Sequence, residues 1–128
     1  MAAIKSFRDL DVYKLSLAEA TRIFVIIKRF PREEMYSLTD QIRRSSRAVG
    51  AMIAAAWARR KYPAAFKSKL DEALEEATET QAWLDHALAC EYINANEHKD
   101  LDKSWQQIGA MVNRMIQRAD DFCQYALK

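Results

Sequence analysis

The residues that could bind a metal are few and badly spaced. A helical bundle can hold a di-iron site built from inward-pointing glutamates and Glu-x-x-His motifs. The two histidines, His86 and His98, follow Trp83 and Ala95 by three residues, so neither completes this motif. The sequence also has no H-E-x-x-H motif and no C-x-x-C pair, which are common signatures of zinc and redox sites. We therefore expect no metal and no cofactor.

Other catalytic arrangements are also missing. Two glycines cannot form a glycine-rich phosphate loop, and the neighbouring Ser45 and Ser46 have no histidine near them in sequence. Four glutamates at helical spacing lie largely off the apolar stripe of their segment, as is typical of a solvated or salt-bridged face. They are Glu72, Glu75, Glu76 and Glu79. The sequence predicts a protein that is not an enzyme and has no small-molecule substrate.

A block of basic residues is the feature that most suggests a partner. Residues 41–70 contain eight Lys or Arg and no acid, whereas residues 71–100 contain nine acids and one Lys. Aromatic residues flank the basic cluster at 59–61, and cations beside aromatic rings suit a phosphate backbone with exposed bases. The candidate contacts with nucleic acid or with another subunit are Arg43, Arg44, Arg47, Trp57, Arg59, Arg60, Lys61, Tyr62, Lys67 and Lys69.

Two uses of this basic block remain open. It could bind RNA, although a net charge of +2 and a pI near 8.6 fall short of a dedicated nucleic-acid binder. Alternatively, it could pair with the acidic block, within the chain or on a neighbouring subunit. Complementary surfaces on one subunit favour head-to-tail association, which closes into a ring when the rotation allows. Trp57, Tyr62 and Trp83 are candidate anchors for such a contact.

The elements that position these residues are predicted to be helices. Two Gly and two Pro cannot supply the turns of an all-β protein, and 128 residues suit one domain with one core. Apolar residues recur at steps of three and four in four segments. We predict a single domain over 1–128, with a lead-in at 1–10 and helices over about 11–29, 34–60, 63–89 and 95–127.

Local signals set the predicted ends of these helices. Phe30-Pro31 ends the first helix, and the second begins near residue 33 or 37. Pro63 opens the third, and Asn94 with Glu97 forms a variant capping box before the fourth. Apolar positions of the first helix include Val12, Leu15, Ala20, Ile23, Phe24 and Ile27, and those of the fourth are Leu101, Trp105, Ile108, Val112, Met115, Ala119 and Phe122.

Four amphipathic helices with short connections predict an all-α, antiparallel up-down four-helix bundle. The two cysteines, Cys90 and Cys123, lie far apart in sequence, and we expect both to be small core residues in a reducing compartment. The start of the chain has no apolar run resembling a signal peptide, and the apolar stretch at 23–27 is far too short to cross a bilayer. We expect a cytoplasmic protein that does not associate with membranes.

Several runs of the sequence resemble the 23S rRNA intervening-sequence proteins, a bacterial family of four-helix bundles. These runs cover nearly the whole chain: FRDLDVY at 7–13, FPREEMYSL at 30–38, QIRRSSRAV at 41–49, AAF at 64–66, KL at 69–70 and ETQAWL at 79–84. One departure is MIAAA at 52–56, where the family often has Asn-Ile-Ala-Glu-Gly. Met52 and Ala55 replace the polar and the acidic residue, so any role of those two side chains is absent here.

This resemblance implies an antiparallel four-helix bundle that assembles as a ring, typically a homopentamer. Some members are encoded within insertions in ribosomal RNA genes, and the bundle is more distantly similar to basic accessory proteins of diversity-generating retroelements. The resemblance therefore implies RNA as a candidate partner, beside the chain itself. No catalytic activity is established for the family.

Overall fold

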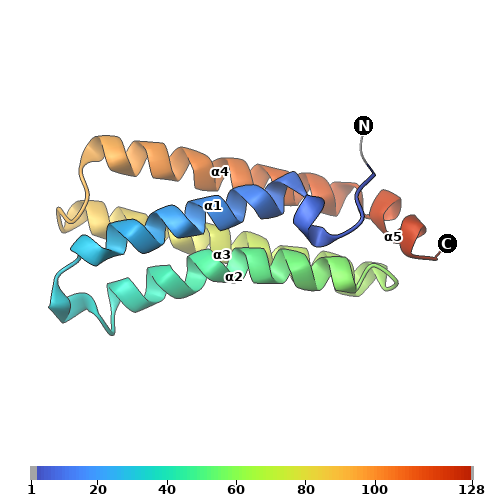
Figure 1. Cartoon of the computed structure of the whole chain (residues 1–128), viewed down its shortest axis with the longest axis horizontal. Helices are drawn as coiled ribbons and strands as arrows, with labels where there is room; N and C mark the ends of the chain where they lie inside the picture. Colours follow the sequence, from blue (N-terminus) through green and yellow to red (C-terminus); the bar gives the residue numbers. More distant parts are fainter. Residues whose placement is uncertain (1–2, 128) are drawn as a thin grey trace.

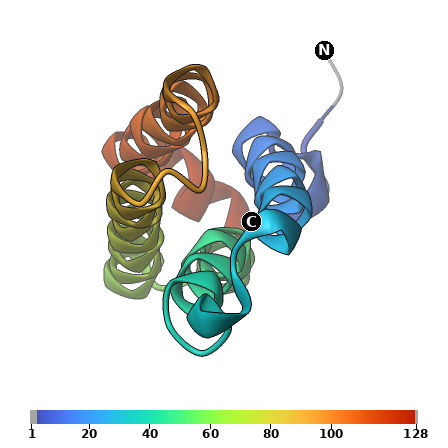
Figure 2. The ribbon, with the colours of Figure 1, turned by 90° about the vertical axis from the view of Figure 1, so that its left-hand side faces the viewer.

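Four long antiparallel helices form the protein, as Figures 1 and 2 show. The computed structural model describes the backbone of residues 3–127 and the side chains of residues 3–123. The long helices are α1 (Asp11–Ile26), α2 (Leu38–Ala58), α3 (Pro63–Ala89) and α4 (Ala95–Gln117), followed by the shorter α5 (Ala119–Leu127). Short 3-10 helices lie at η1 (Phe7–Asp9), η2 (Ile27–Arg29) and η3 (Arg32–Glu34). The predicted all-α, antiparallel architecture is confirmed.

The boundaries of α3 agree with the sequence prediction, but the other three helices differ from it. The first helix ends at Ile26, because residues 27–29 form the separate turn η2. The second helix begins at Leu38, because Ser37 has a non-helical backbone (φ −126°, ψ −109°) and residues 32–34 form the separate turn η3. The predicted fourth helix is interrupted at Arg118, whose φ of −102° and ψ of 24° end α4. This break precedes two buried residues of α5, Ala119 and Cys123.

Two of the helices, η1 and α4, carry side-chain caps on the amides at their N-terminal ends. The predicted capping box of α4 is confirmed, because the Asn94 side chain accepts from the Glu97 amide at 2.8 Å and the Glu97 carboxylate accepts from the Asn94 amide at 3.0 Å. Ser6 and Asp9 form an equivalent box around η1. Local hydrogen bonds thereby satisfy amides at the start of η1 and at the start of α4.

The core consists of apolar side chains contributed by all four long helices. Its largest fully buried members include Trp105, Phe66, Ile23, Ile42 and Leu70. Two sequence predictions about the core are wrong. Phe24 is 41% exposed, because Ile23 of α1 and Ile27 of η2 point inward instead. Cys90 is exposed at the end of α3, whereas Cys123 is buried as predicted.

Small residues allow α2 to lie close to its neighbours. A Cβ placed on Gly50 would meet the Ser16 hydroxyl of α1 at 3.3 Å. On the other side of α2, the buried hydroxyls of Ser45 and Thr80 share a hydrogen bond of 2.8 Å. Met52 packs against the core and adds apolar contact to α2.

Candidate nucleic-acid interface

Three exposed cations and an exposed tyrosine surround the tight turn between α2 and α3. Arg59 and Lys61 lie on the turn itself, and Lys67 lies one turn into α3. None of the three forms an ion pair with another described residue. The Tyr62 side chain is 61% exposed, and its amide donates to the Arg59 carbonyl at 2.9 Å. We call Arg59, Lys61, Tyr62 and Lys67 the turn cluster.

Trp57 and Arg60 lie beside the turn cluster but are occupied with each other. The Arg60 guanidinium carbon lies 3.7 Å from the centre of the Trp57 ring, and its Nε donates to the Trp57 carbonyl at 2.8 Å. The half-buried Trp57 ring also meets Phe122 edge-on, with ring centres 6.5 Å apart. The Trp57 ring is therefore covered by Arg60 and Phe122. Tyr62 is the more exposed aromatic residue at this end of the bundle.

The remaining basic residues of α2 and α3 are mostly paired locally. Arg43 and Arg44 both contact Asp40 at 2.9 Å, and the hydrogen bond from Arg43 is the main cause of the lowered pKa of that carboxyl. Lys69 pairs with Glu72 at 3.1 Å. This is the one recorded ion pair between the basic segment 41–70 and the acidic segment 71–100 in the described part of the chain. The two blocks are therefore not used up by pairing with each other within one subunit.

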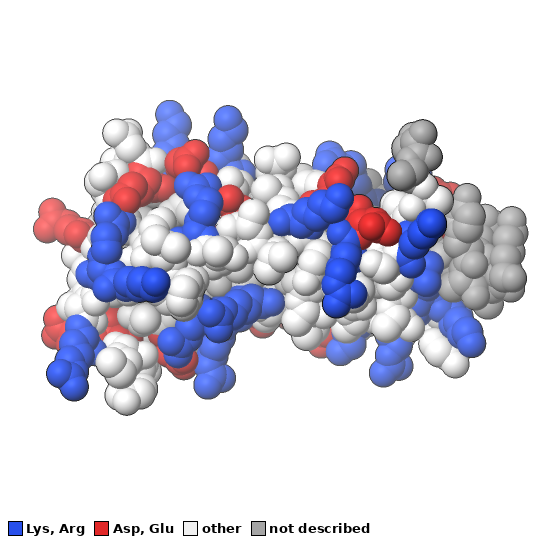
Figure 3. Space-filling view, viewed as in Figure 1, with Lys and Arg blue, Asp and Glu red and all other residues white. Residues whose placement is uncertain are grey.

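A second cationic cluster joins α1 to α2, and the sequence analysis missed it. Lys28 Nζ lies 4.6 Å from the centre of the Phe24 ring, and the Arg47 guanidinium carbon lies 5.6 Å from it. Phe24 and Lys28 are four residues apart, which places them on one helix face, but no sequence signal brings Arg47 to them. Figure 3 shows basic side chains along the length of this face of the bundle, with fewer acidic ones.

A sequence model of the 23S rRNA-intervening sequence protein family matches residues 8–114, and this range contains both cationic clusters. The chain belongs to this family. A similar solved structure is that of a protein of unknown function from the S23 ribosomal protein family of Bacteroides thetaiotaomicron. It is 30% identical, its TM-score is 0.74, and the match covers 83% of this chain and 95% of that one. No curated protein matches the chain.

The described part of this intervening-sequence family member shows no cluster of metal-binding side chains. Over residues 3–123, no three or more His, Cys, Asp or Glu side chains gather where they could hold a metal ion. His98 pairs with Asp85 at 2.7 Å, and the exposed His86 lies against the half-buried Trp83, with ring centres 5.7 Å apart. None of the helices described is long and apolar enough to cross a membrane.

Glu76 is a partly buried carboxyl on the acidic face of α3. Burial raises the pKa of this carboxyl, and the neighbouring Glu79, Glu75 and Glu72 raise it further. A carboxyl whose pKa is raised by folding stabilises the protein below its unfolded pKa, and this contribution is lost as pH rises through the folded pKa.

We expect Glu76→Gln to stabilise the protein by about 0.5 kcal/mol at pH 7. The substitution removes a partly buried negative charge that is repelled by Glu79 and Glu72, three and four residues away. Near pH 3, where the carboxyl is already protonated, the gain should vanish. Urea unfolding of both proteins at the two pH values tests this, with Glu33→Gln, an exposed change outside α3, as the control. An equal gain at both pH values would contradict the explanation.

Proposed function

We propose that this protein is a non-enzymatic, self-assembling helical bundle of the cytoplasm that binds RNA through its turn cluster. The observation that carries the proposal is the exposure of Arg59, Lys61 and Lys67, without an ion pair to any described residue, around the exposed Tyr62 ring. Unpaired cations bind phosphates and release counterions, and a neighbouring aromatic face accepts an unstacked base. The name of the family, which refers to an intervening sequence of 23S rRNA, fits this partner.

Self-assembly is supported by large apolar side chains left on the surface. Leu17, Met35 and Tyr36 are 55%, 42% and 90% exposed, respectively. Apolar groups of this size gain free energy when a partner removes them from water. The similarity to the family implies a ring, typically of five copies, and a ring would repeat the turn cluster around one assembly. Repetition would raise the avidity for a polyanion without any new contact.

Fluorescence anisotropy with labelled single-stranded and hairpin RNA, titrated at several salt concentrations, tests the RNA part of the proposal. With about three phosphate contacts per subunit, the logarithm of the binding constant should fall against the logarithm of salt concentration with a slope of about −2 on single strands. Little sequence preference is expected, because the contacts are with the backbone and with ring faces. Absent or salt-insensitive binding would contradict it.

A further inference from the structure

An apolar groove runs between α1 and α2 on the outside of the bundle. It has a volume of about 390 Å³ and is lined mainly by apolar and small side chains, a size within the usual range for binding pockets. The lining residues are Phe7, Tyr13, Ser16, Leu17, Ala20, Ser46, Arg47, Gly50, Ala51 and Ala54.

Small residues of α2 open this groove, and cations mark its ends. Gly50, Ala51 and Ala54 leave room beside the larger rings of Phe7 and Tyr13. The one charged residue in the lining is Arg47, and the Arg8 guanidinium lies over the Phe7 ring at 4.5 Å. The groove therefore suits an apolar side chain that has acidic residues next to it.

The connection between α1 and α2 presents such a group. Tyr36 is 90% exposed, and the adjacent Met35 is 42% exposed. The exposed Glu33 and the partly buried Glu34 precede them, and with Arg32 they give residues 32–36 a net charge of −1. We call Met35 and Tyr36 the knob.

The backbone beneath the knob is held in place. The Met35 amide donates to the Arg32 carbonyl at 3.1 Å, and the Ser37 amide donates to the Glu34 backbone carbonyl at 3.0 Å. The Glu34 carboxylate accepts from the Tyr92 hydroxyl at 2.8 Å, which ties this connection to the one between α3 and α4. A knob held in this way loses little conformational freedom when it binds.

We propose that the knob of one copy of this chain inserts into the α1–α2 groove of the next copy. The inference rests on the proposed self-assembly and names the surfaces that carry it. The knob lies at the end of the bundle where α1 ends, while the groove lies beside the first half of α1, so one copy cannot fill its own groove (Figure 1). Contacts between two different surfaces are head-to-tail, and they close into a ring when the rotation allows.

Two variants that each remove one half of the contact test this proposal. Tyr36→Ser removes the knob and leaves the groove intact, whereas Ala51→Trp fills the groove from an exposed position and leaves the knob intact. Each variant alone should be a monomer of 14.8 kDa by light scattering. Mixed in equal amounts, they should form a 1:1 complex of about twice that mass, because one intact knob then meets one intact groove.

The controls are Val25→Ser and Ala110→Trp, which alter an exposed apolar residue and an exposed alanine outside both surfaces, and both should keep the wild-type mass. Circular dichroism of all four variants verifies folding. If wild type assembles and the two test variants keep its mass, or dissociate without forming the mixed complex, the knob-and-groove contact is refuted while self-assembly stands. A wild type that stays monomeric at all concentrations would refute self-assembly and the contact together.

Discussion

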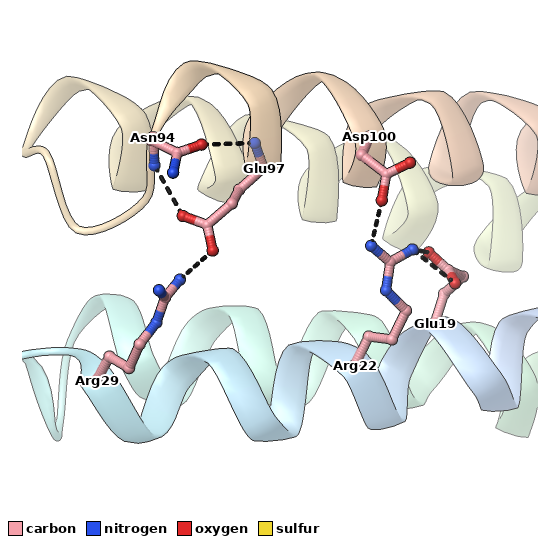
Figure 4. Close-up of polar contacts among 6 residues, drawn as sticks. All are labelled: Glu19, Arg22, Arg29, Asn94, Glu97 and Asp100. Atoms are coloured by element: carbon pink, nitrogen blue, oxygen red, sulfur yellow. Dashed lines mark hydrogen bonds and ion pairs between the residues drawn. The ribbon is translucent and has the colours of Figure 1, made fainter.

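Replacing Arg22 by alanine is expected to lower the free energy of unfolding by about 3 kcal/mol. Glu19 is only 5% exposed, and its two oxygens accept from Arg22 Nη1 at 2.8 and 3.1 Å. Arg22 Nη2 also contacts Asp100 of α4 (Figure 4). Without Arg22, the buried carboxylate has no countercharge, and removing one partner of a buried pair costs about 3–5 kcal/mol. We expect the lower end of this range, because the Arg22 side chain is 41% exposed and water can reach the Glu19 carboxylate once the arginine is removed.

Urea unfolding at neutral pH measures this effect, and Arg29→Ala is the matched control. Arg29, on η2 just after α1, contacts Glu97 of α4 at 2.6 Å, but these two side chains are more exposed than Arg22 and Glu19, at 51% and 29%. Its loss should therefore cost less than about 1 kcal/mol, as for other surface pairs. Adding Glu19→Gln to Arg22→Ala should recover much of the loss. Equal costs for the two arginines, or no recovery, would contradict the importance of the buried charge.

Helix type and most helix limits were predictable because their causes are local. Pro63 and the Asn94–Glu97 box act within one turn, and the structure confirms both. Which side chains of α1 are buried could not be predicted in the same way. Phe24 was assigned to the core from its apolar character, whereas Glu19 is buried instead, with Arg22 as the partner of its charge and Asp100 as the second partner of Arg22. The pairing with Asp100 joins residues far apart in sequence, so no local pattern indicates it.

The sequence predicted that the candidate site is basic, but not which of its residues are already paired or covered. Counting cations located the basic block, yet the count began at residue 41 and so omitted Asp40, which pairs with Arg43 and Arg44. The covering of Trp57 by Arg60 depends on the bend of the chain after α2. The interruption at Arg118 has no Gly or Pro to signal it. The structure thus reduces ten candidate residues to a smaller exposed set, whose role in binding stays a prediction.

Reversing the charge of Arg59 and Lys61 together, as Arg59→Glu with Lys61→Glu, is expected to weaken RNA binding about 100-fold near 0.1 M salt. Each lost phosphate contact costs roughly tenfold under these conditions, because one fewer counterion is released. The salt slope on single strands should also become shallower by about 0.7 for each lost cation. Both residues are exposed and belong to the turn after α2, so the helices should keep their stability.

The matched control is Lys99→Glu with Lys103→Glu, which changes the net charge of the chain equally at two exposed positions of α4. This control should lose much less affinity, since a long-range effect of net charge is screened within about 10 Å at 0.1 M salt. The oligomer mass of both variants separates the two uses of the basic block. If Arg59 and Lys61 contact an acidic face of the neighbouring subunit, their reversal dissociates the assembly, as like charges then oppose each other. If the oligomer mass is unchanged and RNA binding is lost, these cations contact RNA. If both double variants lose the same RNA affinity, the turn cluster acts only through the net charge of the chain, and the proposed site is wrong.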